Sequence, residues 1–437
     1  MERTLISETL EKVGERVRLF GWLYKQRELG GLSFIILRDR SGLIQILAEE
    51  KKELEKVRNI QNGSVLEVEG KVVADKRAPN GVEIREPKIT VLVPVTFIAP
   101  IEIDKAINHK PENFDTLFEN RVLSLRNVTE QKIFKVQATI GKAIRDFFDK
   151  NEFVEIHTPK LLAEATEGGA EVFKTDYFGK SATLAQSPQF YKEMMVGVFE
   201  RVYEIAPVYR AEPSMTTRHM SEYISIDAEM GFISGLSDLI IFLSDLVNYV
   251  VGAVWERCRE DLAELKAQKP ILIKMFPQIP MKELHELYYK ETGRDLRKEK
   301  DPSPEEERFV SEYSLKKWKS EAVFITEFPA SSMKFYHFRS EVNPEVAERA
   351  DLIFRGVEIV TTSRREHRYE KLVEQLKALG EDPENPGYKY FLQAFKFGMP
   401  SLGGFGLGLE RLTQKIIGLS SVKEATLFPR DINRLSP

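Results

Sequence analysis

The sequence has a single cysteine among its 437 residues, Cys258. One cysteine excludes an internal disulfide and a multi-cysteine metal site, which fits a reducing cytoplasm. The chain also lacks a continuous apolar run of about 18 residues, so we expect no transmembrane segment. Its first residues lack the basic and apolar regions of a signal peptide. The net charge of −4 gives no basic excess that would announce a nucleic-acid binder, although a basic patch on one face is compatible with it.

A chain of this length exceeds what one hydrophobic core supports and predicts two or three domains. Residues 1–100 contain five short strand-like runs, with a charged helix predicted over Lys51–Asn62 between the third and the fourth. This order is typical of an OB-fold barrel, a common oligonucleotide binder. The alternative is a small barrel that only packs against a larger domain. The runs are Arg16–Tyr24, Leu32–Leu37, Leu43–Leu47, Val65–Glu69 and Ile89–Val93.

A second, larger domain is predicted over residues 128–437, after a polar linker or hinge at 101–127. Strand-like runs alternate with short helices over 182–232 and 323–408, which indicates an α+β domain with a largely antiparallel sheet flanked by helices. Residues 266–318 are interpreted as a small solvated insertion. Charge patterning assigns its acid-rich run to a solvent-facing surface without a function.

Three further segments of this domain have clear patterns. Apolar residues at helical spacing predict a helix over Gln131–Lys150, and Val154–Pro159 continues as a strand that ends at the proline. A long helix is expected over Leu236–Leu265.

Phe397–Leu412 is rich in glycine and leads directly into a predicted helix. Its glycines allow the backbone to approach a bulky ligand closely, and Arg411 lies in the first turn of the helix. A second arginine element lies far upstream, where Arg210 and Glu212 precede a polar loop and a strand. For an isolated pair, a structural ion pair between Arg210 and Glu212 is the alternative. Together the two elements favour a nucleotide site.

These two elements resemble motifs 2 and 3 of the class II aminoacyl-tRNA synthetases. The predicted helix and strand ending at Pro159 resemble motif 1, through which that class dimerises. The neighbouring residues are similar to the aspartyl enzymes of archaeal type, over essentially the whole chain. The resemblance implies an N-terminal OB-fold that binds the anticodon, a class II catalytic domain, a homodimer, and ATP, Mg²⁺, L-aspartate and tRNA as ligands.

Activating an amino acid requires its carboxylate to attack the α-phosphorus of ATP, so the protein mainly positions reactants and neutralises charge. By resemblance, Arg210 bridges the α-phosphate and the substrate carboxylate, and Arg411 covers one face of the adenine and reaches the γ-phosphate. These two arginines are the predicted catalytic residues. The full predicted ATP site is Arg210, Glu212, Arg218, His219, Met220, Tyr223, Glu358, Gly408 and Arg411.

Asp351 and Glu358 are seven residues apart, either on one face of a helix or on separate parts of a hairpin. Their hard carboxylate oxygens suit Mg²⁺ bridging the phosphates. The resemblance places the metal mainly at Glu358, with the hydroxyl of Thr361 as a helper. Without the resemblance, two solvated surface carboxylates would be the preferred interpretation.

An anionic amino acid needs a cation in its pocket, and the resemblance assigns this role to Lys192 and Arg365. Asparaginyl relatives lack the lysine, which argues against an asparagine ligase. Glu167 and Asp227 are expected to take the substrate ammonium group. The predicted aspartate site is Glu167, Gln189, Lys192, Arg210, Asp227, Thr361 and Arg365.

The chain departs from the family at two places. Thr362 and Ser363 replace glycines, which predicts a crowded pocket or a stiffer loop and raises the alternative of a paralogue that does not charge tRNA. Lys334 stands where relatives usually have proline, and the sequence gives no interpretation for it.

The anticodon surface is predicted to include Tyr24, Phe34, Gln45 and Pro79. Phe34 suits base stacking and Gln45 suits hydrogen bonding to a base edge, although the sequence alone also allows Phe34 in the core. Strict family members have tryptophan and lysine at the places of Tyr24 and Pro79. Proline brings no donor, so we expect a relaxed enzyme that charges both tRNA(Asp) and tRNA(Asn); a strict tRNA(Asp) enzyme is the alternative.

Overall fold

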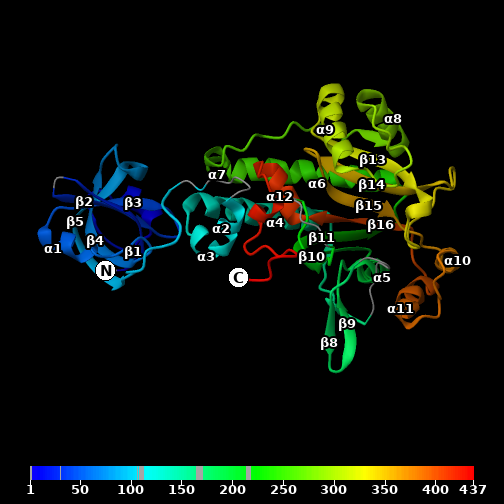
Figure 1. Cartoon of the computed structure of the whole chain (residues 1–437), viewed down its shortest axis with the longest axis horizontal. Helices are drawn as coiled ribbons and strands as arrows, with labels where there is room; N and C mark the ends of the chain where they lie inside the picture. Colours follow the sequence, from blue (N-terminus) through cyan, green and yellow to red (C-terminus); the bar gives the residue numbers. More distant parts are fainter. Residues whose placement is uncertain (1, 30, 106, 108–112, 164–170, 213–217) are drawn as a thin grey trace. The chain divides into compact units, whose positions relative to one another are not determined.

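The computed structural model describes residues 2–29, 31–105, 107, 113–163, 171–212 and 218–437. The chain divides into two compact units, Met1–Gln131 and Lys132–Pro437. The first unit contains a closed five-stranded barrel, and the second contains an eight-stranded sheet and a small three-stranded sheet (Figure 1). The predicted fold class is therefore confirmed.

The barrel arises from strands in which apolar residues alternate inward. Its order is β1-β2-β3-β5-β4, and β3 pairs with β5 in parallel to close it. The predicted helix between the third and fourth strands is confirmed and ends at Val57. The elements are β1 (Arg16–Leu29), β2 (Leu32–Arg38), β3 (Leu43–Ala48), α1 (Lys51–Val57), β4 (Val65–Ala74) and β5 (Val82–Val93).

The predicted linker contains two short helices, α2 (Phe114–Glu119) and α3 (Arg121–Ser124). Arg121 and Glu130 form an ion pair with 3.0 Å between Nη1 and Oε2, and both side chains are fully buried. This segment groups with the barrel in the first unit.

The large sheet has the order β12-β13-β14-β15-β16-β11-β10-β6. Only the outermost pairs, β12 with β13 and β10 with β6, are parallel, so the expectation of a largely antiparallel sheet is confirmed. The strands are β6 (Val154–Glu155), β10 (Arg201–Tyr209), β11 (Glu222–Gly231), β12 (Gln278–Pro280), β13 (Ala322–Pro329), β14 (Val346–Phe354), β15 (Val357–Arg364) and β16 (Leu402–Gly408).

Helices α4 (Val128–Lys150) and α6 (Leu236–Arg257) contribute to the main core together with apolar residues of β11, β14 and β16. The predicted helix to Leu265 is interrupted at Cys258, where the backbone leaves the helical conformation before α7 (Arg259–Glu264). Helix α6 is long and apolar enough to cross a membrane by length and composition. Most of its apolar residues lie in the domain core, which is the arrangement of a core helix.

The remaining elements complete the second unit. Helices α5, α10 and α11 form a second apolar cluster, and the β8–β9 hairpin projects beside them (Figure 1). Helix α12 follows directly after β16. The bounds are β7 (Leu161–Leu162), β8 (Lys174–Tyr177), β9 (Lys180–Leu184), α5 (Gln189–Phe199), α10 (Tyr369–Ala378), α11 (Pro386–Lys396) and α12 (Leu409–Ile417).

Residues 266–318 are packed, so the interpretation of a solvated segment is wrong. Helices α8 (Met281–Thr292) and α9 (Pro304–Trp318) lie side by side next to β13 (Figure 1). Leu284 and Val310 are fully buried in a cluster with residues of β13. Charge counting missed this because the apolar residues are spaced between acids on amphipathic helices.

The glycines of β16 have different steric requirements. A Cβ at Gly404 would overlap the carbonyl oxygen of Ala228 and the carboxylate of Glu229 on the neighbouring β11. A Cβ at Gly406 would lie 3.4 Å from the nearest atom, Asp227 Oδ1, which is ordinary contact. The glycine at 404 therefore makes room for a buried side chain of the protein itself.

We predict that Gly404→Ala lowers the free energy of unfolding by about 1–3 kcal/mol or more, since overlap with backbone cannot be relieved by a rotamer change. Gly406→Ala on the same strand is the matched control and should stay within about 0.5 kcal/mol. Urea unfolding of the two variants measures the difference. Equal stability of both variants would contradict this packing.

Candidate active site

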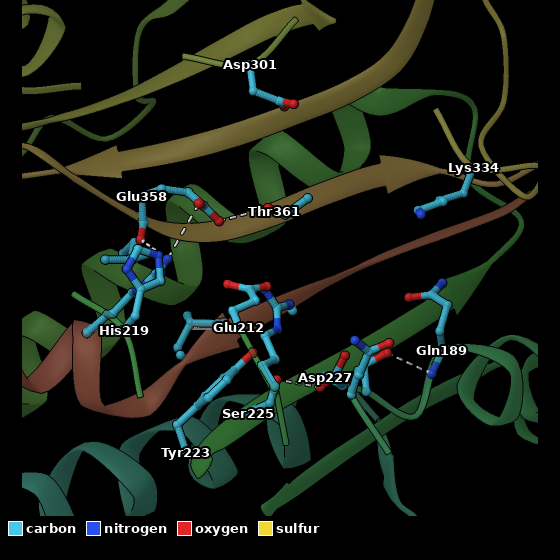
Figure 2. A pocket seen from close by; sticks show the side chains of 18 of the residues that line it. Gln189, Glu212, His219, Tyr223, Ser225, Asp227, Asp301, Lys334, Glu358 and Thr361 are labelled. Carbon is cyan, nitrogen blue, oxygen red and sulfur yellow. Dashed lines mark hydrogen bonds and ion pairs between the residues drawn. The ribbon is translucent and has the colours of Figure 1, made fainter. Parts of the chain in front are cut away.

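A cavity of about 600 Å³ opens on the sheet, lined by residues of β11, β15, β16, α5 and α12 (Figure 2). Side chains alternate across a strand, so Ile226 and Ala228 of β11 enter the main core while Ser225 and Asp227 face the cavity. A volume of this size is typical of small-molecule sites.

The two predicted arginine elements meet in this cavity. Arg210 lies directly after β10, with its guanidinium carbon 5.8 Å from the ring centroid of Tyr223. Arg411, in the first turn of α12, donates from Nη1 to the carbonyl oxygen of Glu358 at 3.0 Å. Arg210 and Glu212 are 4.0 Å apart and both are more than 40% exposed, so this pair contributes little to the fold. The fold therefore places both arginines where a ligand can reach them.

His219, Met220 and Gly408 also line the cavity, as expected. Burial lowers the pKa of His219, and the nearby Arg411 acts in the same direction. The imidazole is therefore neutral near pH 7 and offers a hydrogen bond rather than a charge.

The acid-rich run provides a contact that the sequence did not reveal. Glu307 of α9 forms an ion pair with Arg218 and accepts a hydrogen bond from the backbone nitrogen of Glu358 at 2.8 Å. Asp301 lines the cavity and lies 3.2 Å from Arg349. A capped helix start predicts acids in its first turn, but no sequence signal shows which of them meets an arginine.

The predicted metal residues lie on the hairpin of β14 and β15, where Asp351 is opposite Thr361. The hydroxyl of Thr361 donates to Glu358 Oε1 at 2.9 Å. Burial raises the pKa of Asp351 to about 7, and the charge of Glu358 acts in the same direction against that of Arg349. The two carboxylates thus lie on the two strands of one hairpin, Asp351 buried and Glu358 partly exposed, and the hairpin alternative is the correct one.

The donor set is compatible with Mg²⁺, which prefers carboxylate oxygens and keeps ligands from phosphate and water. Asp351 Oδ2 already accepts from Arg349 at 2.8 Å, which leaves Glu358 the better placed ligand. Within the described ranges, no group of three or more His, Cys, Asp or Glu residues forms a metal cage. A metal here would need ligands from a bound phosphate.

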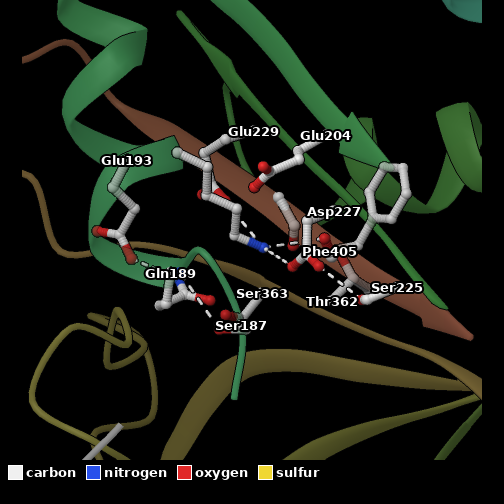
Figure 3. Close-up of polar contacts among 12 residues, drawn as sticks. Ser187, Gln189, Glu193, Glu204, Ser225, Asp227, Glu229, Thr362, Ser363 and Phe405 are labelled. Atoms are coloured by element: carbon white, nitrogen blue, oxygen red, sulfur yellow. Dashed lines mark hydrogen bonds and ion pairs between the residues drawn. The ribbon is translucent and has the colours of Figure 1, made fainter. Parts of the chain in front are cut away.

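The floor of the cavity holds two buried cations, Lys192 and Arg365. Figure 3 shows Asp227 and Phe405, which bind the first of them. Lys192 Nζ donates to Asp227 Oδ1 and to the carbonyl oxygen of Phe405, both at 2.9 Å. Arg365 Nε donates to Glu229 Oε1 at 2.8 Å. Asp227, which was expected to take the substrate ammonium group, therefore already supplies a counter-charge to Lys192.

Glu229 is a site residue that the sequence interpretation missed. It holds Arg365 with both oxygens and lies 3.6 Å from Lys192 Nζ. Its position two residues after Asp227 was a usable signal, because a strand places both on the same face.

Thr362 and Ser363 do not crowd the cavity. The Thr362 hydroxyl donates to the carbonyl oxygen of Gly404 at 3.0 Å, and the Ser363 hydroxyl accepts from Arg365 Nη1. Both side chains are fully buried, so they fix strand β15 and the arginine. The departure therefore gives no support to the alternative of a paralogue that does not charge tRNA.

The structure does not describe all of the other residues that are predicted to bind the substrate aspartate. Gln189 and Thr361 line the cavity, whereas Glu167 lies outside the described residues. Lys334 also lines the cavity, across from His219 (Figure 2).

The predicted anticodon residues differ in exposure. Phe34 and Gln45 point out of the barrel, so the alternative of a core Phe34 is wrong. Pro79 begins a short 3₁₀ turn at Pro79–Gly81 and is partly exposed. Tyr24 is only 7% exposed and bonds to the backbone of Val128, so its ring is not presented to a base as expected.

Comparison with known proteins gives the family. Residues 113–432 match tRNA synthetases class II (D, K and N), and residues 17–92 match the OB-fold nucleic acid binding domain. The chain belongs to the class II tRNA synthetases of this D, K and N group.

Individual relatives narrow the comparison. The chain is 41% identical to an aspartate–tRNA(Asp/Asn) ligase of Methanopyrus kandleri, over 98% of both chains. It is 40% identical to an aspartate–tRNA(Asp) ligase of Thermococcus kodakarensis, over 99% of this chain and 98% of the other. The solved asparaginyl-tRNA synthetase of Pyrococcus horikoshii with asparaginyl-adenylate superposes with a TM-score of 0.92 at 30% identity, covering both chains fully.

We predict that Glu307→Ala raises the KM for ATP about fivefold, equivalent to about 1 kcal/mol, because Arg218 loses the carboxylate that orients it. Glu305→Ala is the matched control on the same turn, since that side chain is 43% exposed and its ion pairs are with the surface residues Arg294 and Arg308. Initial rates at varied ATP concentration measure the difference. An unchanged KM in Glu307→Ala would show that Arg218 does not depend on this acid.

Proposed function

We propose that this chain is an aspartate–tRNA ligase that forms aspartyl-adenylate from ATP and L-aspartate and transfers the aspartyl group to tRNA. The observation that carries the proposal is the pair of buried cations, Lys192 and Arg365, at the floor of a cavity that also contains Arg210 and Arg411. The relatives of highest identity among those described are aspartate ligases.

Selection of aspartate over asparagine follows from hydrogen-bond donors rather than from an unpaired charge. Lysine has three N–H donors and arginine has five. The described hydrogen bonds use two of the three donors of Lys192 and three of the five donors of Arg365. One donor on Lys192 and two on Arg365 are thus left for a ligand. A carboxylate accepts at both oxygens, whereas the amide of asparagine would direct its NH₂ donors at these donors.

The arginines supply the chemistry of adenylate formation. Attack of the substrate carboxylate on the α-phosphorus gathers negative charge near Arg210, and pyrophosphate leaves on the side of Arg218 and Arg411. Glu212 faces the adenine amino group and Tyr223 stacks on the base. When bound, Mg²⁺ held by Glu358, with Asp351 and Thr361 beside it, neutralises charge on the outer phosphates.

An asparagine-specific ligase is the second candidate, because solved asparaginyl enzymes share the fold closely. Pyrophosphate exchange with aspartate and asparagine in parallel separates the two candidates. We expect exchange with aspartate only, and exchange with asparagine alone would overturn the proposal.

The same assay tests the arginine assignment. Arg210→Ala should lower the exchange rate with aspartate by about 10²–10³-fold, since it removes a preorganised donor from the developing charge. Arg201→Ala at the opposite end of β10 is the control, because Arg201 bonds to the backbone of Asn151 and lies outside the cavity lining. If Arg210→Ala retains the wild-type rate, Arg210 is not catalytic.

We also propose that the enzyme charges tRNA(Asn) as well as tRNA(Asp). Proline at position 79 supplies no donor to a base, and the buried Tyr24 supplies no stacking face. Phe34 lies outside the barrel core, and Gln45 donates from Nε2 to Glu83 at 2.8 Å. The anticodon site therefore has few side chains that could distinguish two anticodons that differ at one base.

The prediction is tested by charging purified tRNA(Asp) and tRNA(Asn) transcripts side by side. We expect efficiencies within about a hundredfold, which is about 2.7 kcal/mol. A larger preference for tRNA(Asp) would identify a strict enzyme. A Tyr24→Phe variant is the control, and because Tyr24 is buried it should leave the ratio unchanged.

A cytoplasmic homodimer completes the proposal. Large apolar side chains are exposed around β6, the edge strand of the sheet: Val154, Val198, Phe199 and Phe232. Strand β6 contains the segment that resembles motif 1, and a symmetric partner would cover this apolar edge. Light scattering of the purified protein would give a monomer mass if this assignment is wrong.

A further inference from the structure

Glu193 is a buried carboxylate that the proposed chemistry leaves without a role. It directly follows Lys192 in the sequence of α5 and is fully buried. Its Oε1 accepts from Gln189 Nε2, and it lies 3.7 Å from Arg365 Nε. Glu193 thus stands behind two side chains that are expected to touch the substrate.

The charges around Glu193 do not balance if every acid is ionised. Lys192 and Arg365 carry two positive charges, while Asp227, Glu229 and Glu193 would carry three negative ones. All five residues are at least 96% buried, so an excess charge among them would be costly. One of the three acids must therefore be neutral for the group to be balanced.

Of the three acids, Glu193 lies farthest from its nearest cation. Asp227 lies 2.9 Å from Lys192 and Glu229 lies 2.8 Å from Arg365, whereas Glu193 lies 3.7 Å from Arg365. Its Oε2 is buried and makes no hydrogen bond within the described part of the chain. A negative charge on this oxygen would have no donor to stabilise it, which costs more than burying the neutral acid.

Charged residues from several elements influence the ionisation of Glu193. Arg365 follows β15, Glu229 lies on β11, and Lys192 is on α5 itself, while α11 contributes aromatic packing through Phe391 against Phe190. Burial raises the pKa of Glu193 to about 8, and Glu229 acts in the same direction against Arg365 and Lys192. The acid is mostly protonated at pH 7 and ionises as the pH passes 8.

We propose that Glu193 is a positioning residue that works as a neutral acid, holding Gln189 and adding no second negative charge beside Arg365, whose remaining N–H donors are directed at the side-chain carboxylate of the substrate. Ionisation of Glu193 would put a second carboxylate on Arg365 and weaken aspartate binding. The inference rests on the proposed aspartate site and adds to it a pH limit set by one residue.

The test compares the wild type with Glu193→Gln, which keeps the shape and the acceptor for Gln189 but cannot ionise. The KM for aspartate in pyrophosphate exchange is measured from pH 7 to 9, with the KM for ATP as an internal readout. If only the protonated form binds aspartate, the wild-type KM rises about tenfold over this range, because about ten in eleven molecules are ionised at pH 9 when the pKa is about 8.

We expect the two proteins to have the same KM for aspartate at pH 7 and only the wild type to show the steep rise, with the KM for ATP following one profile in both. Parallel aspartate profiles would overturn the inference, as would a Glu193→Gln variant that fails to fold or to bind aspartate at pH 7. Wild-type enzyme that does not activate aspartate at pH 7 would instead contradict the proposed function itself.

Discussion

The buried ion pair between Lys192 and Asp227 is the interaction on which the rest of the site depends. An ammonium group taken out of water is stable only when its charge and its donors are satisfied, and here Asp227 and the carbonyl oxygen of Phe405 do this. The requirement explains the neighbouring strands. Strand β11 must present its acids on one face, and β16 must carry glycine at 404 so that the side chain of Glu229 has room beneath it.

The cavity also contains side chains that are more exposed than the two buried cations on its floor. Lys192 and Arg365 have fixed partners, and in the proposed function they direct their remaining donors at the substrate. Arg210 is 42% exposed and lies 4.0 Å from Glu212. In the proposed function, the buried cations provide selectivity and the exposed arginine provides rate, and these roles need different degrees of rigidity.

Local patterns predicted the barrel, the antiparallel sheet and the cavity-lining arginines, because alternation and motif spacing depend on neighbours in sequence. The pairing of Lys192 with Asp227 and of Arg218 with Glu307 could not be predicted in this way, since each joins distant elements through tertiary packing. The prediction that Tyr24 is exposed to a base was wrong for a related reason. A tyrosine next to a strand irregularity can turn inward, and sequence alone does not record which way.

The central claim is that donors on Lys192 and Arg365 select a carboxylate. Calorimetric titration with non-hydrolysable sulfamoyl analogues of aspartyl-adenylate and asparaginyl-adenylate tests it directly, because binding is measured without the chemical step. The account predicts tighter binding of the aspartyl analogue by at least about 2 kcal/mol, or roughly thirtyfold. Equal affinities, or tighter binding of the asparaginyl analogue, would contradict it.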